Sequence, residues 1–148
     1  MDRYMNANIV FSKFSRNYME LKKDLPIRPS EMAVLNIITQ REGKFTPLMI
    51  ADLLGVSKPM IAAHIRVLLK KGYILKERSE DDGRSFYVLP TDKAVALTDK
   101  FNAKQTEYLK NLESSLGEAE FNKLVLLLDK ALPTLEYQKE NKLCKTMK

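Results

Sequence analysis

The sequence predicts a mainly α-helical fold with one small β-hairpin, and three observations support this fold class. Apolar residues recur at intervals of three and four along much of the chain, which is the period of an amphipathic helix. Near the middle, two helix-forming runs are separated only by a short turn that contains glycine. Two β-prone runs joined by an Asp-Gly pair follow, and they predict the hairpin.

Bulk composition narrows the class of protein. A chain of 148 residues is expected to form one domain with a sizeable core. The formal net charge is +6 and the pI is about 9.3, which favours a polyanionic partner such as nucleic acid. The start of the chain, MDRYMNANIV, is not typical of a signal peptide, and the longest aliphatic runs are too short to cross a bilayer. We therefore expect a soluble, cytoplasmic protein with no membrane contact.

The first helix is predicted over residues 4–24, and a second follows two prolines. The apolar stripe of the first helix has helical spacing and is formed by Val10, Phe14, Tyr18, Leu21 and Leu25. The second helix is predicted from Glu31 to about Arg41. Pro29 suits its first turn, and an acidic Glu31 suits the positive end of its dipole.

The next two helices form a helix-turn-helix pattern. Thr46 is a good N-cap for a short helix that Gly55 should end. Ser57 is placed to cap the following helix, which Gly72 should end. Because so few residues separate the two helices, they are expected to cross in the manner of a helix-turn-helix.

The second of these helices has an unusual outer face. Ile61, Ile65 and Leu68 share one arc that can be buried. An ordinary solvated face would be rich in Glu, Lys and Gln, but the opposite arc is small or apolar, with two cations and no acid. That arc consists of Pro59, Met60, Ala63, Arg66, Val67 and Lys70.

The rest of the chain predicts a hairpin and two long helices. YILKER and SFYVL are the two strands, and Thr91 caps a helix that runs to about Leu112. Gly117 opens the last helix, Pro133 is expected to end or kink it, and the basic tail is expected to fray. Its apolar stripe contains Phe121, Leu124, Leu127, Leu128 and Leu132. The helices on either side of the central helix-turn-helix and hairpin carry more apolar side chains than that central part needs for its burial. These apolar stripes suggest a partner, most simply a second copy, although the alternative is that they form an ordinary core.

In this order and spacing, four segments resemble the MarR family of bacterial transcription regulators. IRPSEMAVL is similar to the opening of the family's second helix, and ADLLGVSKPMIAAHIRVLLKKGYI to its helix-turn-helix and entry into the wing. DDGR contains the family's Asp-x-Arg wing signature as Asp82 and Arg84, and LPTDKAVAL resembles the helix after the wing. The resemblance spans nearly the whole chain.

The resemblance implies an obligate homodimer on double-stranded DNA, with a fold organised around a winged helix-turn-helix. Residues 30–90 would form that DNA-binding part of a single domain, 1–148, and residues 1–29 and 91–148 would form the helical dimerisation part. The fourth helix would enter the major groove, and the wing arginine the adjacent minor groove. Many members release DNA when a small ligand or an oxidant acts near the junction of the two parts.

Three departures from the family pattern limit this transfer. Arg28 stands where Thr or Ser often caps the second helix, and Ala94 stands where a glycine is common. The family's redox sensors carry a cysteine near the N-terminal helix, but the only cysteine here is Cys144. It cannot form an intramolecular disulfide, and we interpret it as a bystander.

Candidate DNA contacts follow from the outer face and the wing. Arg66 suits a bidentate contact with guanine, Met60 and Ala63 suit thymine methyl groups, and Ser57 and Lys58 suit a phosphate at the helix start. The complete predicted set is Ser57, Lys58, Pro59, Met60, Ala63, Arg66, Lys70, Asp82 and Arg84. The alternatives are that the outer face packs on another protein element and that EDDGR is only a solvated turn. In the functional interpretation, Asp82 orients Arg84.

Other classes of site have little support. His64 is interpreted as a half-buried packing residue, and one His and one Cys far apart do not predict a metal site. No P-loop, G-x-G-x-x-G or G-x-S-x-G motif is present, so an enzyme is not expected. We expect a repressor that binds a palindromic operator, needs no cofactor and responds to an effector of unknown identity. The alternative is an architectural or protein-interaction module without a specific operator.

Overall fold

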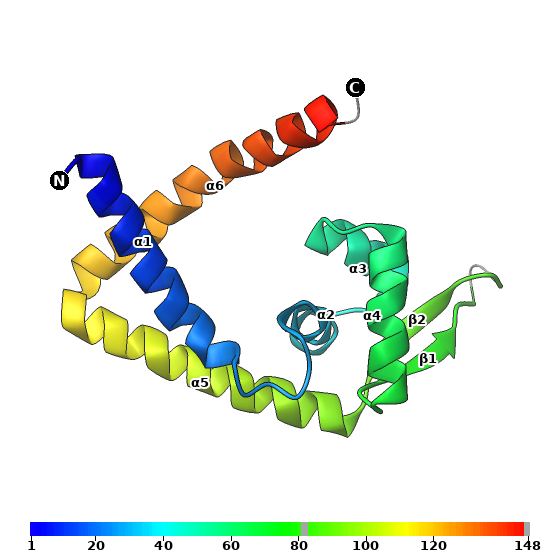
Figure 1. Cartoon of the computed structure of the whole chain (residues 1–148). Coiled ribbons are helices and arrows are strands. Elements are labelled where there is room, and N and C mark those ends of the chain that lie inside the picture. The colour runs from blue at the N-terminus through cyan, green and yellow to red at the C-terminus, as the bar shows by residue number, and fades with distance from the viewer. Residues whose placement is uncertain (81–82, 147–148) are drawn as a thin grey trace. The chain divides into compact units, whose positions relative to one another are not determined.

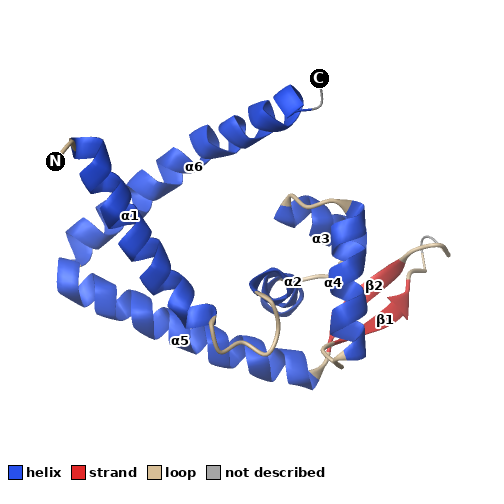
Figure 2. Ribbon diagram, viewed as in Figure 1, coloured by secondary structure: helices blue, strands red, loops and turns tan. Residues whose placement is uncertain are grey.

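The computed structural model describes residues 1–80 and 83–146, with side chains through residue 135 (Figure 1). It divides into two compact units, residues 1–104 and 105–148. The described part is mainly helical, with one antiparallel pair of strands, so the predicted fold class is confirmed (Figure 2). In chain order, its elements are α1 (Arg3–Met19), a short 3-10 helix (Glu20–Lys22), α2 (Pro29–Gln40), α3 (Pro47–Leu54), α4 (Lys58–Lys70), β1 (Ile74–Arg78), β2 (Phe86–Pro90), α5 (Asp92–Leu116) and α6 (Glu118–Thr146).

Helix α2 begins with a cap that the sequence did not suggest. Arg28 has no side-chain acceptor for the first turn, but the carboxylate of Glu31 accepts the backbone N–H of Arg28 at 3.0 Å. This is the second half of a capping box, in which the third helical residue reaches back to the cap. Pro29 occupies the first helical turn, where its missing N–H leaves no bond unmade. Glu31 is buried and Arg28 is exposed, so this part-buried bond lies at the edge of the core.

The N-caps of α3 and α4 and the turn between the two helices match their predictions. The Thr46 hydroxyl accepts the N–H of Met49, and the Ser57 hydroxyl accepts the N–H of Met60, each at 3.3 Å. Gly55 ends α3 with φ of 65° and ψ of 36°, the left-handed conformation in which a side chain would be strained. As a result the chain bends by 116° between the two helices.

The core of the first unit lies between α2, α3, α4 and the hairpin. Ile61, Ile65 and Leu68 of α4 are buried in it, as their spacing predicts. Burying a side chain of this size contributes about 1.5–3 kcal/mol, so α4 is held firmly on the core by one face. The other buried apolar residues of this cluster include Met32, Leu35, Ile38, Ile50, Ile74, Val88 and Phe101.

The hairpin, which we call the wing (residues 74–90), is fixed to the helices by backbone bonds. Its register pairs Ile74 with Pro90 at the base and Arg78 with Phe86 toward the tip. The N–H of Val88 donates to the carbonyl of Phe45 at 2.8 Å, which joins the wing to the start of α3. Because the register and this bond are both set, the wing has a defined position beside α4 within its unit.

The two C-terminal helices differ in part from their predicted extents. Thr91 caps α5 through the N–H of Ala94 at 3.4 Å, but α5 extends to Leu116 rather than Leu112. Pro133 was expected to end or kink the last helix; it does not end it, because α6 continues to Thr146 with Pro133 inside it. The expected fraying of the tail is not seen over its helical residues, 140–146. A proline removes one backbone donor, and the bonds of the adjoining turns can carry a helix across it.

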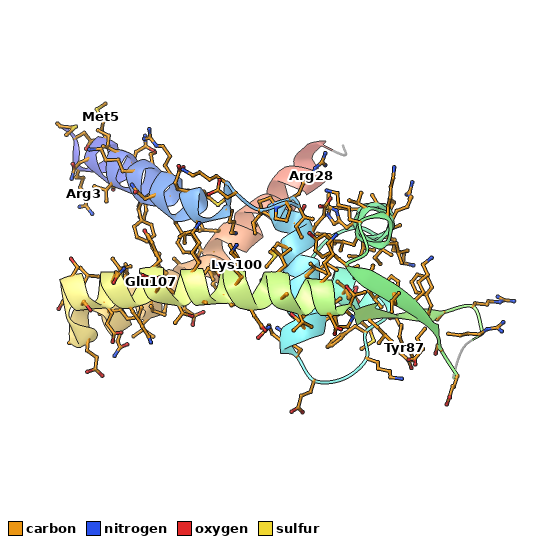
Figure 3. The ribbon with its side chains drawn as sticks, turned by 90° about the horizontal axis from the view of Figure 1, so that it is seen from below. Arg3, Met5, Arg28, Tyr87, Lys100 and Glu107 are labelled. Atoms are coloured by element: carbon orange, nitrogen blue, oxygen red, sulfur yellow. The ribbon has the colours of Figure 1, made fainter. Side chains whose placement is uncertain are left out.

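The outer helices carry exposed side chains of two kinds. Large apolar residues are exposed on α1 and on α6, each considered by itself. Charged residues are exposed along α5, including Lys100 and Glu107 (Figure 3). In the part of the chain that the structure describes, no single helix is long and apolar enough to cross a membrane; only α3 and α4 taken together reach that apolarity, across their bend.

Candidate nucleic-acid interface

The outer face of α4 is accessible along its whole length. Ser57, which caps the helix, is exposed, and so is every helical member of the predicted DNA-contact set: Lys58, Pro59, Met60, Ala63, Arg66 and Lys70. Val67, on the same arc, is half-buried. Because the opposite face is fixed in the core, these side chains project from a rigid element. Such placement suits a recognition surface, which must hold its groups in a defined register.

The charged residues on the outer face of α4 are all cationic. Lys58, Arg66 and Lys70 provide cations at the start, middle and end of α4, and α4 contains no acidic residue. Between the cations lie Met60 and Ala63, which are exposed and uncharged. Cations interspersed with small apolar groups fit the major groove, where phosphates flank base edges and thymine methyl groups.

The start of α4 offers fewer free backbone N–H donors than the sequence suggests. Pro59 has no N–H, and the N–H of Met60 donates to the Ser57 hydroxyl. An anion at this helix start would therefore depend more on the Lys58 side chain than on a fan of free backbone N–H groups. Ser57 serves the helix as a cap, a role that competes with direct phosphate contact.

The wing places Arg84 in an exposed position beyond the paired strands. Asp82, which was predicted to orient it, lies outside the described residues. The Lys44 ammonium contacts the carboxylate of Glu77 in β1 at 2.6 Å and lies 5.6 Å from the ring centre of Tyr87 in β2. Its hydrogen bond with Glu77 raises the pKa of Lys44 above the usual value. These contacts link the wing to the loop between α2 and α3.

A groove of about 550 Å³ lies between α4, the wing and the start of α3. Three cations of the predicted DNA-contact set line it, namely Lys58, Arg66 and Arg84. A fourth cation, Lys76 of β1, also lines the groove and is not predicted from the sequence; its ammonium lies 4.4 Å from the ring centre of Phe86. Lysine is common on exposed strands, so its presence in β1 indicates nothing by itself. Only the packing of the wing on α4 shows that Lys76 lies in the groove with the other cations.

Two further predictions concern histidine and metals. His64 is half-buried, as expected of a packing residue, and its Nε2 atom is buried without a hydrogen-bond partner within the described residues. Among those residues, the structure contains no group of three or more His, Cys, Asp or Glu side chains placed to hold a metal ion.

Comparisons with known proteins agree with this geometry. The family model described as transcriptional regulator SarA/Rot matches residues 16–101. An uncharacterized HTH-type transcriptional regulator of Bacillus subtilis, YpoP, is 28% identical over 115 residues, which are 78% of this chain and 81% of YpoP.

Solved structures share the fold at low sequence identity. Streptococcus pneumoniae FabT, determined in complex with DNA, has a TM-score of 0.77 and 21% identity, covering 90% of this chain and 97% of FabT. A mutant of MarR from E. coli has a TM-score of 0.67 and 22% identity, covering 90% of this chain and 98% of MarR. These structures confirm the winged-helix fold of MarR-type regulators that the sequence motifs indicate, and the family model places the chain among transcriptional regulators.

Proposed function

The chain belongs to the SarA/Rot family of transcriptional regulators, and from this premise we propose that it is a homodimeric repressor that releases its operator when an effector binds. Its place in a family of DNA-binding regulators, rather than of enzymes, fits the absence of catalytic motifs from the sequence. The proposal concerns the finer points: which residues touch DNA, how the chain assembles, and how binding is controlled.

One observation carries the assignment of the DNA-binding surface. The outer face of α4 is exposed, cationic and free of acids, and the groove beside it continues the cationic surface onto the wing. A face that packed against another protein element would not need cations from separate elements of the fold. Duplex DNA carries closely spaced phosphates and so complements such a surface.

The roles of individual residues follow from their places on α4 and the wing. Arg66, at the middle of α4, donates to the O6 and N7 atoms of guanine. Met60 and Ala63 lie against thymine methyl groups, and Lys58 and Lys70 contact phosphates at either end of the helix. Pro59 and Ser57 shape the helix start against the sugar-phosphate backbone.

The wing supplies the second point of contact. Arg84 enters the minor groove, where a cation gains most if the groove is narrow. Asp82 holds the guanidinium by an ion pair before DNA arrives, which reduces the ordering that binding requires. DNA reading is thus assigned to residues 30–90.

Dimerisation is assigned to residues 1–29 and 91–148 of the single domain. On α6, large apolar side chains stay exposed in the single chain, with Leu127 at 54% and Leu132 at 51% exposure. On α1, Tyr4 and Phe11 are likewise exposed. Several large apolar side chains exposed on one helix are typical of an interface, and a second copy is the simplest partner for such a regulator.

Repression is steric in this scheme. The dimer places two copies of α4 about 34 Å apart, on successive turns of one face of the duplex, and blocks polymerase. An effector favours a dimer shape in which the two helices no longer match the half-sites. The cytoplasm is the compartment where such a regulator meets the chromosome.

Selection of bound duplexes from a random pool tests the proposal. A homodimeric reader enriches an inverted repeat with half-site centres about one helical turn apart. An architectural module without an operator enriches nothing and shows binding that falls steeply with salt on every duplex. That second result would overturn the proposed function.

A further inference from the structure

The end of α4 is joined to the start of α5 by a set of directional hydrogen bonds (Figure 1). Three successive backbone carbonyls follow the last turn of α4, and each accepts a bond from a residue at the beginning of α5. The Lys93 ammonium donates to the carbonyl of Lys71 at 2.6 Å. The hydroxyl of Thr91 donates to the carbonyl of Gly72 at 2.8 Å, and its N–H donates to that of Tyr73 at 3.0 Å. We call this set of bonds the α4–α5 junction.

Lys93 occupies an unfavourable place in its own helix. It lies in the first turn of α5, where the positive end of the helix dipole disfavours a cation. Its ammonium instead reaches the C-terminal end of α4, where the dipole is negative and carbonyls lack partners within the helix. The ammonium also lies 4.4 Å from the ring centre of Tyr73, a core residue that is 5% exposed. The contacts of Lys93 therefore stabilise the connection to α4 rather than α5 itself.

The packing of α5 does not by itself define the direction in which this helix leaves α4. Ala94, Thr98 and Phe101 bury one side of α5 in the first unit. Apolar burial has no preferred direction, so it tolerates small rotations of a helix about its contact. A charge-assisted hydrogen bond depends on both distance and angle. The bond from Lys93 also pairs a carbonyl at the surface, where water can serve instead, so its effect is to restrain the angle rather than to satisfy a buried group.

The direction of α5 matters because this helix begins in the unit of residues 1–104 and ends in that of residues 105–148. In the proposed homodimer, α5 connects the DNA-contacting part of each chain to its dimerisation part. The angle between α4 and α5 then helps to decide where the two copies of α4 meet the duplex. One added base pair between half-sites rotates a half-site by roughly 34° and moves it by about 3.4 Å. A small change of angle is therefore enough to alter which spacing fits.

We propose that Lys93 is a positioning residue, which fixes the angle between α4 and α5 and thereby sets the half-site spacing that the dimer accepts. Lys93 acts through the carbonyl of Lys71 and the ring of Tyr73, and it does not touch DNA. The proposal deepens the proposed function and rests on it for the dimer and the operator. The restraint on the angle depends only on the α4–α5 junction within one chain.

Three substitutions separate this role from others. Lys93→Met keeps a long unbranched side chain but removes the donor and the charge, and the fold should tolerate it because Lys93 is exposed. Lys93→Arg keeps both a donor and a cation for the Tyr73 ring. Lys100→Met is the matched control, since Lys100 is an exposed cation on the same helix outside the junction.

The angle is measured first, without DNA, by electron spin resonance between two spin labels in the full-length chain. Ala63→Cys on α4 and Ala103→Cys on α5 are exposed positions for the labels, and Cys144→Ser removes the natural thiol. Mixing with excess unlabelled chain leaves only distances within one chain. The parent should give one narrow distance distribution. Lys93→Met should broaden it about twofold, while Lys93→Arg and Lys100→Met should match the parent.

The spacing is measured second, with the duplex that the parent selects and with duplexes in which one or two base pairs are added or removed between the half-sites. The parent should lose about tenfold in affinity for a change of one base pair, because the half-site is then both rotated and shifted. Lys93→Met should lose about threefold or less, and Lys93→Arg should restore the parental preference. Base preference inside each half-site should not change, because α4 itself is unaltered.

Each other result would overturn the proposal in a recognisable way. Equal weakening at every spacing by Lys93→Met would make Lys93 a phosphate contact. Lower thermal stability with an unchanged distance distribution and spacing preference would make it merely structural. If the parent binds all spacings alike, the spacing role fails while DNA binding stands. If the parent binds no duplex, the proposed function fails together with the spacing role, and the label distances alone decide whether Lys93 restrains the angle.

Discussion

Arg66 of α4 and Arg84 of the wing line the same groove, although they belong to different elements of the fold. The backbone bond from Val88 to Phe45 and the burial of the inner face of α4 hold those elements in place. The two guanidinium groups can therefore act on one duplex from a shared, rigid unit. Arg66 is assigned to the major groove and Arg84 to the minor groove, and each contact can be measured.

Arg66→Ala should weaken binding to the selected operator by about 1–3 kcal/mol, because a bidentate guanine contact is lost. Preference at one position of each half-site should relax, while binding to random duplex should change less. Titration of both duplexes with each protein measures the difference. Arg41→Ala is the control, since it removes an exposed cation outside the interface. Equal losses on operator and random duplex would reduce Arg66 to a phosphate contact.

Arg84→Ala should weaken operator binding most where A·T-rich flanks narrow the minor groove. The dependence of log affinity on log salt should fall by about one unit, because roughly one fewer cation engages the duplex. Asp82→Ala should give a milder form of the same defect. The measurement is operator affinity at several salt concentrations on A·T-flanked and G·C-flanked sites. Arg78→Ala removes another exposed cation of the wing and should have a smaller effect. Parental affinity of Arg84→Ala on both sites would mean that the wing does not touch DNA.

Deletion of residues 117–148 should leave a monomeric or unfolded chain that no longer binds operator, because it removes the apolar stripe of α6. The paired change Leu127→Asp and Leu132→Asp keeps the helix and should give a folded monomer, as both side chains are exposed in the single chain. Sedimentation measures the mass of each form, and circular dichroism reports the fold. Leu75→Asp alters an equally exposed leucine of the wing and should remain dimeric. An intact dimer after either α6 change would refute the assignment of this interface.

Glu31→Ala should lower the free energy of unfolding by about 1–2 kcal/mol, because the N–H of Arg28 loses its acceptor at the start of α2. Glu31→Gln keeps an acceptor oxygen at that place and should retain most of the stability. Urea unfolding of the two variants and of Glu42→Ala, an exposed control, measures the difference. If Gln and Ala are equally destabilising, the charge or the packing of Glu31 matters rather than its bond to Arg28.

Local chemistry explains what the sequence predicts well. Thr46, Ser57 and Gly55 act through near neighbours in the chain, so their caps and turn can be inferred from short stretches. The buried arc of α4 follows from helical spacing alone. The two-stranded wing likewise follows from two β-prone runs around an Asp-Gly pair.

The features that the sequence did not predict depend on tertiary packing or on a balance between small free-energy contributions. Lys76 joins the groove only because the wing packs beside α4, and nothing in β1 indicates that neighbour. Glu31 was expected to act on the helix dipole, and its bond to Arg28 depends on a side-chain rotamer that the sequence does not specify. Pro133 lies within α6 because one missing bond is outweighed by those of the turns around it. The DNA contacts themselves remain predictions.

The most direct test of the central claim is selection of duplexes from a random pool by the parent protein and by Arg66→Ala, side by side. The parent should enrich an inverted repeat with half-site centres about 34 Å apart and a fixed guanine in each half. Arg66→Ala should enrich the same repeat with that one position relaxed. Enrichment of no common sequence by the parent, or an unchanged sequence preference in Arg66→Ala, would contradict the claim that α4 reads DNA through Arg66.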